Sequence, residues 1–207
     1  MKQTFSYIIL ILITLFLASC SSKEKDEREV SKSANSEMEV YEITFKTAHP
    51  NAQKLITDEF YWNPIEETSP FGNDDGHDAF YGFKEWRESN KTESPIIYLK
   101  ELIKEWNYPT FDFYEMNEAN LKKYISSNRI GEMALTGHDN AIIAVGFGQF
   151  VLEGKIDEDL KTLTKTALKR ELLPSIIEMW EPDYQKQRIK LLTKMLVTVD
   201  EMNENSN

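Results

Sequence analysis

The stretch Ala141-Ile142-Ile143-Ala144-Val145-Gly146-Phe147-Gly148-Gln149-Phe150-Val151-Leu152 decides the fold that we expect for this chain. As a helix it would be apolar nearly all round, which is typical of a helix at the centre of a domain. Gly146 and Gly148 each weaken a helix by about 1 kcal/mol, so we expect them to permit close helix packing. A buried strand is the alternative. Gly154 after the run and Asp157 at the next helix start favour a helical hairpin instead.

Helical periodicity recurs on both sides of this stretch. It predicts helices near residues 50–60, 78–88, 95–106, 117–126, 139–152, 157–173 and 184–199. Tyr41, Ile43 and Phe45 alternate with polar residues, which predicts one strand. Its candidate partners are residues 110–114 and 195–199, although the helical interpretation of 195–199 is stronger. We therefore expect a mainly α fold: a compact multi-helix domain around a buried central helix, with a small strand or hairpin contribution.

The first twenty residues have the pattern of an export signal. A basic start at Lys2 precedes an apolar run over residues 7–17, too short for a membrane-spanning helix, which needs about 20 residues. Leu17-Ala18-Ser19-Cys20 resembles the lipobox of bacterial lipoproteins. The resemblance implies cleavage before Cys20 and acylation of that cysteine, which would anchor the chain in a lipid bilayer. An ordinary secretory signal with a chance cysteine is the alternative.

The segment after the cysteine is polar and charged, without a single aromatic residue. We expect residues 20–38 to form a lipidated cysteine and a flexible tether, after the signal peptide at 1–19. The charges just after Cys20 resemble signals that send some lipoproteins to the cell surface; a plain linker is the alternative. The helical domain would span 39–199, and 200–207 would be a disordered tail. The expected location is the bacterial cell envelope, at the outer membrane and facing either the periplasm or the exterior.

Composition excludes several classes of function. The chain has 207 residues and a formal net charge of −11, so no nucleic-acid partner is expected. Its single cysteine excludes an intramolecular disulfide and a multi-cysteine metal site. The sequence contains none of the common motifs for a nucleophilic serine, a zinc protease or a phosphate loop.

The segment Ser69-Pro70-Phe71-Gly72-Asn73-Asp74-Asp75-Gly76-His77-Asp78 is the most unusual in the chain. Oxygen-rich loops with glycine bind hard cations such as Ca²⁺, which makes Asp74 and Asp75 candidate ligands. The spacing is not that of an EF-hand. In the structural alternative, Pro70 and Gly72 form a turn, and Asp75 or Asp78 caps the next helix.

Gly-His-Asp occurs twice, at residues 76–78 and 137–139. If the two segments meet in space, His77 and His138 with Asp78 or Asp139 are candidate ligands for zinc or another divalent cation. His49 would be the third histidine. The alternative is that Asp139, like Asp78, is simply a helix cap. No cofactor is predicted beyond this possible cation.

Several short motifs are similar to the uncharacterised bacterial YfeS-like family. They are Ala48-His49-Pro50, Phe60-Tyr61-Trp62, residues 69–76 with Asp78-Ala79, Trp86-Arg87, residues 152–157 and Leu172-Leu173-Pro174. The similarity covers most of residues 46–182 and implies one helical domain built around the FGNDDG turn. It implies no reaction. Some members are associated with a WGR domain, a module of nucleic-acid transactions, but this chain contains no Trp-Gly-Arg triplet.

These observations lead to three hypotheses about function. The first is a non-catalytic lipoprotein that binds a protein or a small molecule at the envelope. A variant of it is an immunity-type inhibitor of a toxin, because an acidic surface suits a basic partner. The third hypothesis is a metal-dependent enzyme that uses the FGNDDG loop and both Gly-His-Asp triplets. The aromatic-rich segments at 60–62 and 71–86 are expected to form core, with a sugar or peptide platform as the alternative.

Overall fold

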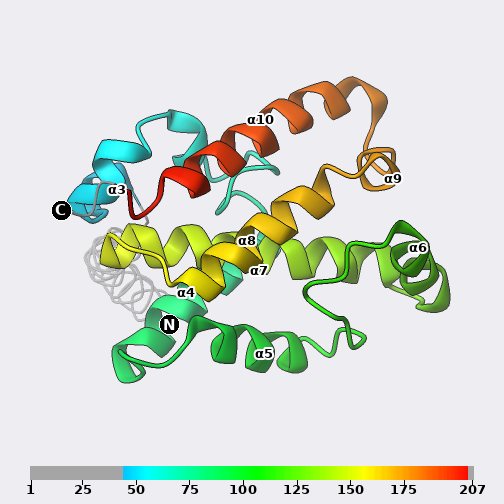
Figure 1. Ribbon diagram of the computed structural model, residues 1–207, viewed down its shortest axis with the longest axis horizontal. Helices are drawn as coiled ribbons and strands as arrows, with labels where there is room; N and C mark the ends of the chain where they lie inside the picture. Colours follow the sequence, from blue (N-terminus) through cyan, green and yellow to red (C-terminus); the bar gives the residue numbers. More distant parts are fainter. Residues whose placement is uncertain (1–43, 205–207) are drawn as a thin grey trace, which may run out of the picture. The chain divides into compact units, whose positions relative to one another are not determined.

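The structure is a computed structural model, and it describes residues 44–204. Every regular element in this range is a helix, which confirms the expected mainly α fold (Figure 1). The short 3-10 helices are η1 (Phe45–Thr47) and η2 (Glu59–Trp62). The α-helices are α3 (Pro50–Leu55), α4 (Asp74–Ser89), α5 (Pro95–Glu105), α6 (Glu118–Ser127), α7 (Gly131–Glu153), α8 (Glu158–Glu171), α9 (Pro174–Ile177) and α10 (Pro182–Glu201).

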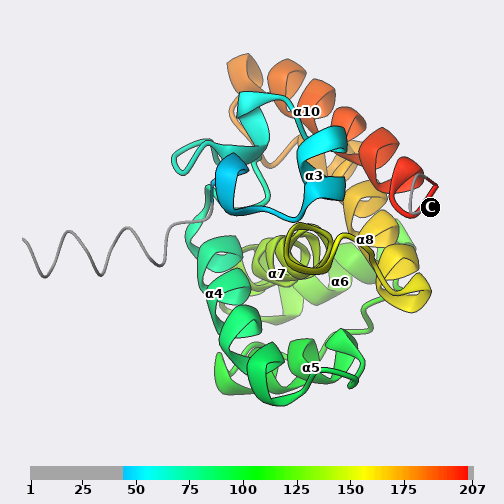
Figure 2. The same ribbon diagram turned by 90° about the vertical axis from the view of Figure 1, so that its left-hand side faces the viewer.

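Helix α7 forms the centre of the domain. Figure 2 looks nearly along its axis, with α4, α3, α8 and α5 around it. All residues from Ala141 to Val151 are buried. A Cβ atom on Gly146 would lie 2.1 Å from Oγ1 of Thr164 in α8, and one on Gly148 would lie 2.5 Å from the Phe80 ring in α4. The two glycines therefore admit neighbouring helices on different faces, as expected from the sequence.

Local sequence signals explain where several helices begin and where α7 ends. The side chains of Asn73, Ser94 and Asn117 accept hydrogen bonds from the first turns of α4, α5 and α6. Gly154 ends α7 with a φ of 71°, a conformation that glycine adopts without steric cost. Helix α7, however, begins at Gly131 rather than at the expected Asp139. Its N-cap residue, Ile130, makes no side-chain capping bond, so no local signal marks this start.

The expected strand is not found in the described part of the chain. Residues 40–43 lie outside it, and Phe45 belongs to η1. Of the two candidate partners, residues 110–114 form an irregular segment and residues 195–199 lie within α10. Residues 44–204 thus contain helices and connecting segments without a strand.

The C-terminal segment is ordered further than expected. Helix α10 continues to Glu201, and Met202 is buried. The side chain of Asn203 accepts a hydrogen bond from the backbone N–H of Ile156 at 3.0 Å and donates one to the Ile156 carbonyl at 2.7 Å. The prediction of a disordered tail from residue 200 was therefore wrong for 200–204, because these contacts fix the segment against the α7–α8 connection.

The described residues, 44–204, belong to one compact unit. The expected signal peptide, Cys20 and the tether lie outside the described residues. Within residues 44–204, no helix combines the length and the apolar character that crossing a membrane requires.

Candidate functional site

The FGNDDG segment is a tight loop held by Asn73. Its side-chain oxygen accepts from the Gly76 N–H at 2.8 Å, and its amide nitrogen donates to the Glu67 carbonyl at 3.1 Å. A Cβ atom on Gly72 would lie 2.4 Å from the Glu66 carbonyl oxygen, so the loop needs glycine there. The loop does cap the next helix, α4, as the structural alternative predicted. The capping residue, however, is Asn73 and not the expected Asp75 or Asp78.

An open depression of about 340 Å³ lies beside this loop. We call it the acidic groove. It is lined by Glu67, Asn73, Asp74, Asp75, Glu132, Met133, Thr136, Asn140, Met179 and Trp180. These residues come from the loop, the first turn of α4, the first half of α7 and the connection after α9. Four carboxyl groups thus share one concave surface with a tryptophan and two methionines, and the described lining contains no lysine or arginine.

Asp75 is the carboxyl group of the acidic groove that the fold holds most firmly. The Tyr108 hydroxyl donates to its Oδ1 at 3.0 Å. Burial raises the pKa of Asp75, and the hydrogen bonds from Tyr108 and Asn140 offset part of that rise. Asp75 also lies close to Gly137, where an added Cβ atom would be 3.2 Å from its Oδ2. The first Gly-His-Asp region and the second are therefore neighbours, as the metal hypothesis required.

The two histidines nevertheless do not converge. His138 is completely buried, and the rings of Tyr108, Phe111, Phe113 and Tyr124 surround it at centroid distances of 5.6, 5.3, 5.8 and 6.4 Å. Burial lowers the pKa of His138 to about 4. The ring is therefore neutral at physiological pH, and it fixes the segment between α5 and α6 against α7.

His77 occupies a different environment. Its side chain is 55% exposed, with Nδ1 lying 3.6 Å from the carboxylate of Asp78, which is 73% exposed. His49 caps α3, where its Nδ1 accepts from the Asn51 N–H at 3.2 Å. Among residues 44–204, no group of three or more histidine, cysteine or acidic side chains is arranged to hold a metal ion. The candidate ligands of the sequence analysis are thus divided among the groove, the surface and the core.

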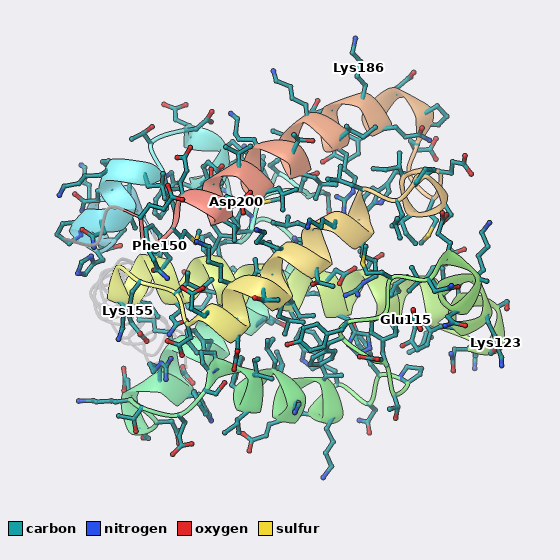
Figure 3. All side chains as sticks on the ribbon, in the orientation of Figure 1. Glu115, Lys123, Phe150, Lys155, Lys186 and Asp200 are labelled. Carbon is teal, nitrogen blue, oxygen red and sulfur yellow. The ribbon has the colours of Figure 1, made fainter. Side chains whose placement is uncertain are left out.

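Asp139 belongs to a buried ion pair rather than to a helix cap. The Nε of Arg170 lies 3.1 and 2.9 Å from the two carboxyl oxygens of Asp139, and Nη2 makes a further short contact. Both side chains are fully buried. Arg170 Nη1 also donates to the carbonyls of Phe113 and Glu115, at 3.0 and 2.8 Å. Arg170 thereby joins α8 to α7 and to the segment before α6, on which Figure 3 labels Glu115.

A second buried pair lies beside the first. Arg188 of α10 donates from Nη2 to Oε2 of Glu171 at 2.6 Å, and from Nη1 to the Thr68 hydroxyl at 3.1 Å. Its guanidinium carbon lies 3.7 Å from the ring centroid of Trp180, which lines the acidic groove. Lys186, one half-turn earlier, points away from the domain in Figure 3. Trp180, which forms part of the groove wall, therefore packs against the buried guanidinium of Arg188.

The hydrogen bonds that begin at Arg188 continue from Thr68 through Tyr184 to Glu66. The Thr68 and Tyr184 hydroxyls are 2.6 Å apart, and Tyr184 donates to Glu66 in a short hydrogen bond. Sequence reasoning missed the buried roles of Arg170, Glu171 and Arg188. One signal was available: Glu171 continues the helical spacing of the buried residues Leu160, Leu163, Thr164, Ala167 and Leu168.

The aromatic segments are mostly core, as expected. Tyr61, Phe71, Phe80 and Phe83 are buried, and the Phe71 and Phe80 rings pack at a centroid distance of 4.8 Å. Phe71 of the loop thus packs on Phe80 of α4, and Phe80 also lies against α7 at Gly148. The Phe71–Phe80 contact holds the groove-forming loop in place, and the four buried rings do not form an exposed platform.

Comparison with known proteins gives one informative similarity. The chain is 32% identical over 148 residues to the uncharacterized protein YfeS of Escherichia coli strain K12, an alignment that covers 65% of this chain and 54% of the relative. The chain thus spans about half the length of that relative. This supports the expected similarity to the YfeS-like family. No family model matches the sequence, and no solved structure matches it.

Proposed function

We propose that this chain is a bacterial lipoprotein, anchored at the cell envelope through acylated Cys20, whose helical domain binds a basic segment of a protein partner. The acidic groove is the single observation that carries the binding role. It combines concavity, four carboxyl groups and three large apolar side chains, one of them exposed, at one place on the domain. The YfeS relative adds no activity to this proposal, because its name describes none.

The chemistry of the groove suits a lysine or arginine side chain. Glu67, Asp74 and Glu132 are exposed, so their charges attract a cation without the cost of burying an unpaired carboxylate. Met133 is 55% exposed and offers an apolar contact to the methylene part of such a side chain. Electrostatic complementarity of this kind mainly increases association rates and specificity. It also disfavours nucleic acid, whose phosphates the same carboxylates repel.

Neutralising the groove is expected to weaken binding of a fluorescently labelled oligoarginine peptide by about tenfold, because each lost exposed charge contributes up to about 1 kcal/mol. The variant is Glu67→Gln/Asp74→Asn/Glu132→Gln, and fluorescence anisotropy at low salt measures the dissociation constant. Glu101→Gln/Glu105→Gln/Asp159→Asn is the matched control: it removes the same charge from exposed positions outside the groove. Equal weakening in both variants would show that net charge, and not the groove, binds the peptide.

Replacing Cys20 by serine tests the anchor separately. Acylation requires the cysteine sulfur, so the variant is expected to lose all labelling by a fatty-acid probe and to leave the membrane fraction of expressing bacteria. Binding of the oligoarginine peptide should be unchanged, since Cys20 lies outside the domain that forms the groove. Retained labelling in the serine variant would contradict the lipoprotein proposal and leave the groove proposal intact.

A further inference from the structure

The two buried ion pairs bring two carboxyl groups together at one place. Asp139 of α7 and Glu171 of α8 are both completely inaccessible to solvent. Glu171 is within hydrogen-bonding contact of Asp139. Yet Oε1 of Glu171 is buried and receives no hydrogen bond from any N–H or O–H group of the described residues. Two ionised carboxylates in contact would repel each other, and neither has a hydrogen to donate.

None of the surrounding charged groups within residues 44–204 makes a hydrogen bond to this oxygen. The charged and titratable groups that act on the two ion pairs are Arg170, Arg188, His138, Asp112, Glu115 and Tyr184 with its partner Glu66. Arg170 donates to Asp139 and to two carbonyls. Arg188 donates from Nη2 to Glu171 Oε2 and from Nη1 to Thr68, while its buried Nε makes no hydrogen bond, to Glu171 Oε1 or to any other group of the described chain. The Tyr184 hydroxyl donates to Glu66. His138 hydrogen-bonds toward Pro109 and Tyr124, and Asp112 is itself a carboxylate.

We propose that the folded protein holds one proton between Asp139 and Glu171 at neutral pH, and that this proton joins α7 to α8 beneath the acidic groove. With the proton in place, one carboxyl group donates to the other and the orphaned oxygen is satisfied. Burial raises the pKa of Asp139 even though Arg170 beside it acts in the opposite direction, which agrees with a retained proton. The inference does not depend on what the groove binds.

The pair is connected to the groove through Arg188. This residue contacts Glu171 on one side and lies against the Trp180 ring on the other. When the shared proton leaves, the two carboxylates repel each other across the α7–α8 contact. The position of Glu171, and with it the support of Trp180, then depends on pH. The corner formed by α7, α8 and α10 is thus a pH-sensitive element of the fold.

Glu171→Gln tests the shared proton, because the glutamine amide donates permanently where the proton would sit. Urea unfolding of the full chain in non-ionic detergent is measured at a series of pH values. The measured quantity is the unfolding equilibrium constant of the parent protein divided by that of the variant. Above the ordinary carboxyl pKa near 4, this ratio should rise about tenfold per pH unit, up to the pH at which the folded pair loses its shared proton. Glu178→Gln makes the same change at an exposed position and should give a flat ratio.

A flat ratio for Glu171→Gln over the same range would overturn the proposal. Infrared spectroscopy gives an independent result at neutral pH. The parent protein should show the absorption of one buried protonated carboxyl group, which Glu171→Gln and Asp139→Asn each remove. If Glu171→Gln does not fold, Asp139→Asn provides the donor from the other side of the pair. Absence of that absorption in the folded parent would equally refute the shared proton.

Discussion

Replacing Arg170 by methionine is expected to destabilise the protein by about 3–5 kcal/mol, because it removes one partner of a fully buried ion pair. Asp139 would lose the guanidinium that contacts both of its oxygens. The carbonyls of Phe113 and Glu115 would lose a donor as well, and an unsatisfied buried group costs about 1–3 kcal/mol. Urea unfolding with circular dichroism measures the loss.

The neighbouring position supplies the control for this prediction. Lys169→Met makes a similar change one residue earlier, where the side chain is exposed, and should alter stability by no more than about 0.5 kcal/mol. Adding Asp139→Asn to Arg170→Met should recover part of the loss, since a neutral amide tolerates burial better than a carboxylate. Equal destabilisation by Lys169→Met and Arg170→Met would show that the buried pair is not what holds α8 to α7.

The central helix was predictable because its signal is local. An uninterrupted apolar run from Ala141 to Leu152, followed by a glycine suited to a left-handed conformation, is enough to place a buried helix and its end. The start of the same helix was not predictable in this way. It lies at Gly131, eight residues before the expected Asp139, and its stability comes from packing against α4, α6 and α8. Tertiary contacts of this kind leave no capping residue in the sequence.

The charged core was harder to predict for a related reason. Arg170 lies in the last turn of α8, where a cation suits the helix dipole. A helix end is usually exposed, and only the arrival of Asp139 from α7 makes burial of the arginine favourable. Glu171 lies on the apolar face by spacing alone, but spacing does not identify Arg188 of α10 as its partner. Pairings between distant helices depend on the fold as a whole.

In the candidate site, too, features set by neighbouring residues could be predicted from the sequence, and contacts between distant segments could not. The FGNDDG loop was expected to be a capped turn, and the structure confirms a cap while assigning it to Asn73. The setting of Asp75 depends on Tyr108, which comes from the segment after α5. His138 appeared in the sequence as a candidate ligand beside a helix start. Its actual surroundings are four aromatic rings, and three of them belong to the segment between residues 108 and 113.

Two buried groups act on stability in opposite directions as the pH changes. His138 is neutral in the folded protein, whereas an unfolded histidine takes up a proton below about pH 6.5. The proposed Asp139–Glu171 pair keeps a proton that the unfolded chain releases above about pH 4. Between these values unfolding gains one proton at His138 and loses one at the carboxyl pair. Their contributions to the pH dependence of the parent protein therefore offset each other, and each is measured as the difference between the parent and the variant that removes it.

Replacing His138 by phenylalanine is expected to remove the destabilising contribution that this histidine makes in acid. The pKa of His138 is lowered from 6.5 to about 4 by burial, so its contribution is complete above pH 6.5 and disappears as the pH falls toward 4. At about 1.4 kcal/mol per pH unit, this contribution amounts to about 3 kcal/mol over the whole window. Relative to the parent, His138→Phe should therefore gain about 3 kcal/mol between pH 6.5 and pH 4.

The comparison is made by urea unfolding at closely spaced pH values, with His77→Phe as the matched control at an exposed histidine. Phenylalanine suits the aromatic surroundings of His138, so the variant is expected to fold. Combining His138→Phe with Glu171→Gln should remove both opposing contributions and return a pH dependence close to that of the parent. If His138→Phe and His77→Phe both left the slope unchanged, His138 would have to be protonated in the folded protein. In that case the four surrounding aromatic rings would not prevent the His138 ring from carrying a positive charge.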